Sequence, residues 1–298
     1  MIDRGLIALH RVFRRMRSGA RIRRFRTNDG GLWPLYVIEP PPEQVDHGVP
    51  VVFFHGFGND GSTWLPFMSL LGATREVVAP DLPGFGLHSG FSDGDYSPHR
   101  YAAACAELLR ELTVRWGQPP IVVGKSMGAM IAGLVAAEIP KLVRALVLID
   151  PAGIRSPRVS EFWQTWSGGR NLLLPAGPED WEPMIDILYR RRPHIPGFAR
   201  RQALRELLRS RDHLSAVFNG LLSEGFDPLG SALAKLSCPL TLIWGAGDRV
   251  MDPSGVERVR EACPGVEVHL IPGCGHSPTR EHPAEVRRVL LRVVSRYG

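Results

Sequence analysis

The sequence predicts an α/β fold, with a mostly parallel central sheet, helices on both of its faces and an inserted helical lid. Short apolar runs that suit buried strands alternate with helical patterns along most of the chain, which is typical of a parallel sheet with crossover helices. This alternation breaks down over residues 153–233, which are helical in pattern, arginine-rich and aromatic. A length of 298 residues suits one large domain that carries such an insertion.

The first half of the chain alternates strands with helices, and local signals mark several boundaries. Residues 21–27 and 34–38 are predicted strands, joined through the Asp29-Gly30-Gly31 turn. Ser62 suits the N-cap of one helix, and Ser97-Pro98 begins the next. The other strands expected here are residues 49–54, 76–79 and 121–123, and the expected helices are residues 62–71, 97–115 and 127–138.

The second half resumes the alternation after the insertion. An apolar strand is expected at residues 146–149, followed by Asp150-Pro151, and further strands are expected at residues 240–244 and 266–271. A final helix is predicted at residues 283–295. We therefore assign residues 21–152 and 234–298 to the core domain, residues 153–233 to the lid and residues 1–20 to a basic amphipathic N-terminal arm.

One edge of the predicted sheet is where a ligand is expected. Right-handed crossovers bring the carboxyl ends of parallel strands to the same edge, and ligands of such sheets bind beyond it. The residues expected there are His55-Gly56, Asp81, Gly124 to Gly128, Asp150, Asp248 and His276.

The N-terminal arm carries most of the net charge. Nine arginines and one acid lie within residues 1–26, giving this part +8, so the remaining 272 residues contribute −2 to the total of +6. That nearly neutral body argues against a nucleic-acid-binding core. Residues 2–17 fit either an interfacial helix drawn to anionic lipid, or a helix packed on the domain or a mobile basic tail. Their apolar stripe is Ile2, Leu6, Leu9, Phe13 and Met16.

Cysteine usage and hydropathy predict a cytoplasmic protein, with or without peripheral contact to a membrane. The four cysteines form no CxxC pair and no Cys/His cluster of zinc spacing, so we expect free thiols and no metal site, although an even number also permits disulfides. No run reaches about 18 consecutive apolar residues. Arginines interrupt the N-terminus where a signal peptide needs an apolar core. The oligomeric state stays open.

A G-x-S-x-G motif indicates the nucleophile. It runs from Gly124 to Gly128, directly after the strand at residues 121–123 and before the helix at residues 127–138, which is the context that this motif requires. The serine must occupy a strained turn that exposes its hydroxyl, and side chains two residues away on either side would collide there. Ser126 is therefore the candidate nucleophile.

An acid and a base follow in the order that this motif predicts. Asp248 comes directly after one predicted strand and His276 after the next, so the order is serine, aspartate, histidine. The histidine would take the proton of the serine, and the carboxylate would hold the imidazole in its tautomer. Asp150 and Asp252 are rival acids. We favour Asp248 because its loop is glycine-rich, whereas Asp150 runs into Pro151 and the lid.

The developing oxyanion needs two converging backbone N–H groups. We assign them to Phe57, in the turn after the strand at residues 49–54, and to Met127, at the start of the helix after the nucleophile. His55 lies in the same turn, but we interpret it as a loop-packing residue because His276 already supplies the base.

These motifs resemble the α/β-hydrolase fold family, in its monoacylglycerol lipase and bacterial lipase/esterase branch. The resemblance covers residues from about 50 to the C-terminus and rests on HGFGNDGSTW, GKSMGAMIAG, LIDPAGI, LIWGAGDRVMDPSG and GCGHSPTREHP. It implies hydrolysis of carboxylic esters without a cofactor, through an acyl-enzyme on Ser126. Members of this branch often act at membranes, which would suit the basic arm.

The resemblance also limits the alternatives. Epoxide hydrolases and haloalkane dehalogenases use an aspartate nucleophile, so Ser126 excludes both. Carbon–carbon bond hydrolases of ring-cleavage products usually have a tryptophan after the base, where this chain has Ser277. They remain an alternative, as does a non-catalytic ligand-binding protein.

The leading hypothesis is therefore an esterase or lipase for acylglycerols or similar short- to medium-chain esters. Residues of the lid would form the acyl pocket, although packing within the lid is the ordinary role of such side chains. The candidates are Phe162, Trp163, Trp166, Trp181 and Leu172 to Leu174.

Overall fold

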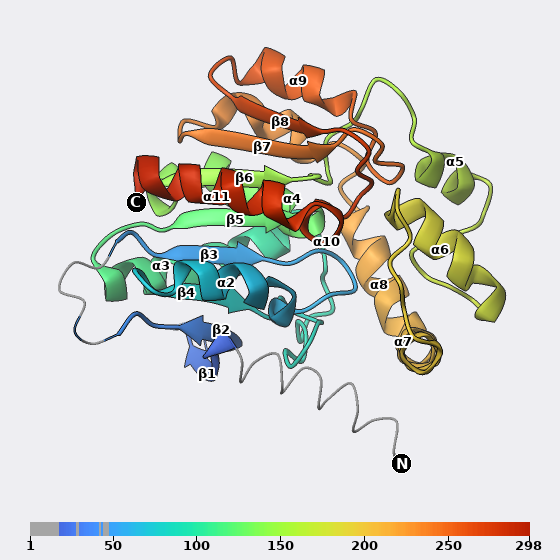
Figure 1. The fold of residues 1–298 in the computed structure, drawn as a ribbon, viewed down its shortest axis with the longest axis horizontal. Helices are drawn as coiled ribbons and strands as arrows, with labels where there is room; N and C mark the ends of the chain where they lie inside the picture. Colours follow the sequence, from blue (N-terminus) through green and yellow to red (C-terminus); the bar gives the residue numbers. More distant parts are fainter. Residues whose placement is uncertain (1–17, 28–29, 42, 44–47) are drawn as a thin grey trace.

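The described part of the chain is built around one eight-stranded sheet (Figure 1). The computed structural model describes residues 18–27, 30–41, 43 and 48–298. The strand order is β1-β2-β4-β3-β5-β6-β7-β8; β2 is antiparallel to both of its neighbours and the other neighbouring pairs are parallel. The mostly parallel sheet that the sequence predicts is thus confirmed. The strands are β1 (Arg21–Arg26), β2 (Leu32–Ile38), β3 (Val51–Phe54), β4 (Val77–Pro80), β5 (Ile121–Lys125), β6 (Ala145–Ile149), β7 (Leu240–Gly245) and β8 (Glu267–Ile271).

Helices cover both faces of this sheet (Figure 1). They are α2 (Leu65–Leu71), α3 (Pro98–Trp116), α4 (Met127–Glu138), α9 (Gly255–Ala262), α10 (Pro278–Glu281) and α11 (Pro283–Tyr297). Because successive strand residues point to opposite faces, Val51 and Phe53 of β3 pack with α2 and α11, whereas Val52 and Phe54 pack with α3 and α4. All four are fully buried, so this strand is an unbroken apolar run.

Two element boundaries differ from the sequence prediction. The predicted N-cap, Ser62, lies inside a 3-10 turn, η1 (Gly61–Trp64), whose cap is Asp60; the Asp60 carboxylate accepts a 2.9 Å hydrogen bond from the Ser62 N–H. Aspartate and serine are equally good caps, so local sequence does not choose between them. Strand β2 begins two residues early, at Leu32, because its ladder with β1 continues through Pro34.

The segment between β6 and β7 leaves the sheet and forms four helices beyond the carboxyl ends of the strands (Figure 1). These helices are α5 (Glu161–Ser167), α6 (Trp181–Leu188), α7 (Gly197–Arg209) and α8 (Arg211–Leu221). Phe162 of α5 belongs to the main core, whereas Trp181 and Leu204 belong to a separate small core of α6 and α7. We propose that this segment, residues 153–233, is the lid.

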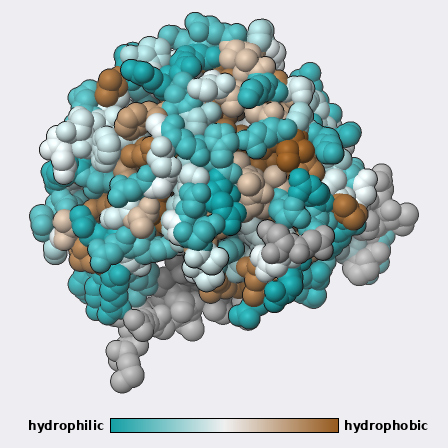
Figure 2. Space-filling view, turned by 180° about the vertical axis from the view of Figure 1, so that it is seen from behind, coloured by the Kyte–Doolittle hydropathy of each residue, from teal (hydrophilic) through white to brown (hydrophobic). Residues whose placement is uncertain are grey.

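The surface of the described residues is mixed in polarity. Apolar side chains are scattered among polar ones over the face shown in Figure 2. Within the described ranges, no helix combines the length and the apolarity needed to cross a bilayer. The predicted interfacial helix at residues 2–17 and Asp29 of the predicted turn lie outside the described residues. All four cysteines are free thiols.

Candidate active site

Ser126 occupies a strained turn between β5 and α4. Its φ of 53° and ψ of −118° lie outside the regions that non-glycine residues normally adopt. A Cβ atom added to Gly124 would lie 2.3 Å from the Gly128 carbonyl oxygen, and one added to Gly128 would lie 2.4 Å from the Phe54 carbonyl oxygen. Backbone atoms therefore leave no room for a side chain at either glycine of the motif, as the sequence predicts.

The structure brings Ser126, Asp248 and His276 together, although they lie on three separate loops. His276 Nε2 lies 3.0 Å from Ser126 Oγ, and His276 Nδ1 lies 2.7 Å from Asp248 Oδ2. A carboxylate can only accept, so Nδ1 carries the proton and Nε2 is left to accept from the serine hydroxyl. All three side chains are buried. This is the geometry that a general base needs to deprotonate the serine.

Backbone amides hold the Asp248 carboxylate in place. Its Oδ1 accepts hydrogen bonds of 2.8 Å from Val250 N and 3.0 Å from Met251 N, which leaves Oδ2 for His276. The proposed lid packs on this loop, because Ser160 Oγ donates to the Val250 carbonyl oxygen. Asp248 is therefore fixed both by its own loop and by the inserted segment.

Neither of the two rival acids forms the hydrogen bond to the imidazole, which Asp248 makes. Asp252 pairs with Arg158 at 3.2 Å, away from the imidazole. Asp150 is fully buried and accepts a 2.8 Å hydrogen bond from the Gly245 N–H. Asp150, Asp248 and His276 place ligand-type atoms within 4.8 Å of one another, which is close enough to hold a metal ion. Both ring nitrogens of the histidine and both Asp248 oxygens are already engaged in hydrogen bonds, so we assign this cluster to proton transfer.

The turn after β3 brings backbone close to the nucleophile. A Cβ atom on Gly56 would lie 3.3 Å from Ser126 Cβ, so the Gly56–Phe57 backbone runs directly past the serine. Met127 begins α4, whose N-terminus carries partial positive charge. Phe57, Met127 and Ser126 line one cavity. The two predicted oxyanion donors are thus neighbours of the serine, on opposite sides of it in sequence.

His55 anchors the turn that carries Phe57. Its Nδ1 lies 2.9 Å from the Gly56 carbonyl oxygen and its Nε2 lies 2.9 Å from the Leu82 amide nitrogen. The carbonyl can only accept and the amide can only donate, so the ring is neutral with its proton on Nδ1. Burial lowers the pKa of His55 to about 4, consistent with a ring held in its neutral form. The structure thus gives His55 the packing role predicted for it.

This buried histidine predicts a loss of stability in mild acid. The unfolded chain protonates His55 near pH 6.5, but the folded protein does so only near pH 4, so its stabilising contribution is complete above pH 6.5 and is lost as the pH falls toward 4. The loss is about 3 kcal/mol at pH 4. Urea unfolding from pH 7 to pH 4 should show it.

His55→Gln should flatten this dependence, because the glutamine cannot take up a proton. Part of the slope should remain, since burial also lowers the pKa of His88 to about 4. The matched control is His194→Gln at an exposed position, which should keep the wild-type slope. If the free energy of unfolding depended on pH equally in the two variants, the assignment of His55 as a buried neutral histidine would be contradicted.

An apolar cavity opens at Ser126. It encloses about 560 Å³, including the part that is open to solvent. Phe162 and Trp163 line it, as predicted for the acyl pocket, and so does Leu173. Trp166 is not a lining residue; it packs edge-on against Trp163, with ring centroids 5.5 Å apart. Trp181 belongs to the small core of α6 and α7.

Several lining residues were missed at the sequence level. Helix α8 and the turn after it supply Phe218, Leu221, Leu222 and Phe226. The first three of these recur at the three- and four-residue spacing of one helix face. That spacing identifies an apolar face, but only the three-dimensional structure shows that it faces Ser126.

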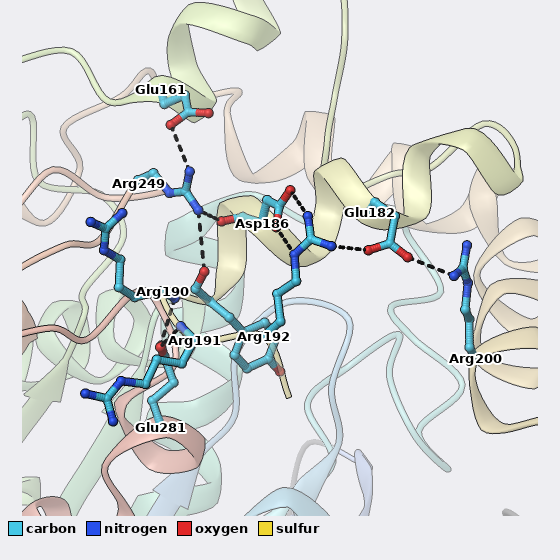
Figure 3. A network of polar contacts seen from close by, with 10 residues as sticks. Glu161, Glu182, Asp186, Arg190, Arg191, Arg192, Arg200, Arg249 and Glu281 are labelled. Atoms are coloured by element: carbon cyan, nitrogen blue, oxygen red, sulfur yellow. Dashed lines mark hydrogen bonds and ion pairs between the residues drawn. The ribbon is translucent and has the colours of Figure 1, made fainter. Parts of the chain in front are cut away.

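A charged network joins the proposed lid to the loops that carry Asp248 and His276 (Figure 3). Arg249, next to Asp248, pairs with Glu161 at 3.5 Å and donates to backbone carbonyl oxygens at the end of α6. Glu281 of α10 accepts hydrogen bonds from the Arg190 and Arg191 N–H groups with one oxygen. Arg192 continues the network through its ion pairs with Glu182 and Asp186.

Glu281 also holds the histidine loop. Its second oxygen accepts a 2.9 Å hydrogen bond from Gly275 N, the residue before His276. A Cβ atom at position 275 would lie 2.7 Å from Arg190 N, so the lid backbone touches this loop directly. The Glu281 carboxylate therefore fixes the loop that carries His276 relative to the lid. A glutamate after the base gives no sequence signal for this role, because charged residues there usually face solvent.

We expect Glu281→Ala to lower kcat about 10-fold with little change in KM, because the imidazole loses its fixed orientation while the acyl cavity stays intact. Three N–H groups also lose a charged acceptor, which should lower the free energy of unfolding by about 2 kcal/mol. Ester kinetics and urea unfolding measure both effects. Glu285→Ala, which removes a surface pair with Arg288, is the matched control and should leave both nearly unchanged.

Several known lipases are similar to this chain. Lipase 3 of Moraxella sp. (strain TA144) is 27% identical over 234 residues, which cover 78% of this chain and 73% of that protein. Monoacylglycerol lipase abhd6-B of Xenopus laevis is 28% identical over 258 residues, covering 82% of this chain and 75% of that protein. A solved membrane phospholipase A, described as a novel bacterial virulence factor, has a TM-score of 0.87 and 29% identity, and covers 99% of this chain and 93% of that one.

The family comparison covers most of the chain. The model of the alpha/beta hydrolase family matches residues 51–289, which includes the serine turn, both further triad loops and the inserted helices. Together with the sheet order and the strained serine turn, this match shows that the chain belongs to the alpha/beta hydrolase family.

Proposed function

We propose that this protein is a serine hydrolase of carboxylic esters that acts through an acyl-enzyme on short- to medium-chain esters, including acylglycerols. The observation that carries the proposal is the position of Ser126 Oγ. It lies 3.0 Å from His276 Nε2 and faces a cavity with an almost entirely apolar lining. An ester carbonyl can reach the nucleophile there while its acyl chain contacts apolar side chains.

The chemistry follows from the hydrogen bonds. Ser126 Oγ attacks the ester carbonyl carbon while His276 Nε2 takes its proton, and Asp248 stabilises the imidazolium that forms. The tetrahedral intermediate collapses when His276 gives this proton to the departing alcohol. Water then attacks the acyl-enzyme by the same route, the acid is released and Ser126 regains its proton.

Two backbone N–H groups, those of Phe57 and Met127, would stabilise the oxyanion. Both residues line the cavity beside Ser126, and the N-terminus of α4 adds favourable partial charge. In this assignment Phe162 and Trp163 contact the acyl chain directly. Trp166 supports Trp163 from behind, by the packing described above.

The relatives support an esterase or lipase over the alternatives. Two of those compared are named as lipases, and the solved structure of a membrane phospholipase A matches over almost the whole chain. A carbon–carbon bond hydrolase acts on polar ring-cleavage products, which would need polar groups in the cavity. Apart from Ser126 itself, the lining offers no charged or hydroxyl-bearing side chain among the described residues.

A chain-length series tests the proposal. Purified protein is assayed with p-nitrophenyl esters from acetate to palmitate, with a monoacylglycerol and with a vinylogous diketone of the ring-cleavage type. We expect turnover of the esters with an optimum at short to medium chains, and none of the diketone. Diketone turnover would favour carbon–carbon cleavage. Absence of any fluorophosphonate label on folded protein would mean a binding protein.

We also propose that residues 2–17 contact anionic membranes peripherally, on the basis of their apolar stripe and arginines. Removing residues 1–20 should weaken co-sedimentation with vesicles of phosphatidylglycerol at least about 10-fold, since several arginines near such a surface each add about 1 kcal/mol. Activity on soluble p-nitrophenyl esters should stay intact. Unchanged co-sedimentation of the shortened chain would rule out this role.

A further inference from the structure

Asp150 is a buried carboxyl group that the mechanism does not use. It directly follows β6, is fully buried and has a φ of 43°, which is unusual for a residue other than glycine. Its Oδ1 accepts the hydrogen bond from Gly245 N, but within the described residues its Oδ2 has no hydrogen-bond partner. An unpaired buried oxygen is costly for a structural aspartate.

The surroundings of Asp150 explain how this oxygen is tolerated. Two carboxylates so close together in a buried site cannot both be ionised at low cost. Burial and then the negative charge of Asp248 raise the pKa of Asp150 well above its ordinary value, which favours the protonated form of its carboxyl group. The charged and titratable groups that face it are Lys125 on β5, Asp248, Cys274 and His276 on the loops after β7 and β8, and Glu281 on α10.

We propose that Asp150 is a second acid of the triad, a positioning residue that shares one negative charge with Asp248 and can take over the stabilisation of His276 when Asp248 is absent. The inference rests on the proposed function, because it concerns the same base. Asp248 forms a hydrogen bond with the imidazole directly, and Asp150 belongs to the same buried cluster, with ligand-type atoms of the three residues within 4.8 Å of one another.

Removal of Asp248 should expose this second role. Asp248→Ala removes the like charge, the second cause of the raised pKa, while burial remains. Asp150 should therefore release its proton to solvent more readily as the pH rises than it does in the wild-type protein. Its carboxylate is then the remaining acid in the buried cluster with His276, and Lys125 nearby favours this ionised form. The remaining activity of Asp248→Ala should therefore increase with pH, through the ionisation of Asp150.

A double-mutant cycle tests the proposal. Asp248→Ala, Asp150→Asn and the combined variant are assayed with p-nitrophenyl acetate from pH 5 to pH 9. The asparagine keeps the acceptor for Gly245 but cannot ionise. We expect Asp248→Ala to lose about 10²-fold in kcat, less than the 10⁴-fold that loss of a triad acid typically costs, and Asp150→Asn to remove a further 10-fold or more in that background. The ascending limb of the pH profile should become shallower with it, although His276 must still be unprotonated to act as the base in every variant.

The controls separate this proposal from a general loss of structure. Asp248→Ala combined with Asp252→Asn should match Asp248→Ala alone, because Asp252 pairs with Arg158 outside the cluster. If the alanine variant does not fold, Asp248→Asn replaces it in the cycle. If kcat and the pH profile of Asp248→Ala are the same with and without Asp150→Asn, the proposal that Asp150 is a second acid is overturned. Absence of wild-type ester turnover would instead overturn the proposed function itself.

Discussion

Ser126→Ala should lower kcat for p-nitrophenyl butyrate by at least about 10⁴-fold while leaving the fold intact. The hydroxyl is the only group placed to form the acyl-enzyme in the proposed mechanism, and loss of a triad nucleophile removes nearly all catalysis except that of the oxyanion donors. Stability should not fall, because alanine relieves the cost of a hydroxyl in a buried turn and keeps the Cβ. Kinetics and thermal unfolding measure the two effects.

Labelling separates a lost nucleophile from a damaged site. A fluorophosphonate probe should modify the wild-type protein at residue 126 and should not modify Ser126→Ala. Ser295→Ala, at an exposed position on α11, is the matched control and should keep both label and activity. An alanine variant that retained more than about one hundredth of the wild-type kcat would exclude Ser126 as the nucleophile.

The positions of the strands along the chain were predictable from sequence. Short apolar runs predicted all eight strands to within about two residues at each end, and β2 begins two residues early because its ladder with β1 passes through Pro34. The motif around Ser126 and the order of the later acid and base then placed three distant residues at one edge. The structure brings these three into hydrogen-bond distance.

Strand patterns alone do not separate Asp150 from Asp248 as the acid partner of His276, for a physical reason. Asp150 and Asp248 both follow parallel strands that are neighbours in the sheet, so strand periodicity brings both carboxylates to the same edge. Which one reaches Nδ1 of the imidazole depends on the path of each loop. The structure shows a direct bond from Asp248 and an unpaired oxygen on Asp150.

The cavity and the charged network were beyond the reach of sequence patterns. Apolar residues of α8 have the spacing of any packed helix, and only the position of that helix over Ser126 makes them lining residues. Glu281 joins amides from two segments about 90 residues apart along the chain. No local pattern encodes such a contact, which arises from the docking of the lid on the triad loops.

Gly128→Ala should lower both the stability and the activity of the protein strongly. The added Cβ would lie 2.4 Å from the Phe54 carbonyl oxygen and 2.5 Å from that of His55, and both atoms belong to backbone that cannot turn aside. Either α4 or the end of β3 must move, and these elements carry the two proposed oxyanion donors. We expect the free energy of unfolding to fall by about 3 kcal/mol and kcat to fall by about 10²-fold or more.

Gly265→Ala is the matched control, because a Cβ atom there meets nothing within 4 Å. It should leave activity unchanged and raise stability slightly, by reducing the freedom of the unfolded chain. Urea unfolding and ester kinetics on both variants separate a steric clash at Gly128 from a general effect of replacing glycine. If Gly128→Ala stayed as stable and as active as Gly265→Ala, the close approach of β3 to the serine turn would be wrong. The assignment of Phe57 and Met127 as paired oxyanion donors would then lose its structural basis.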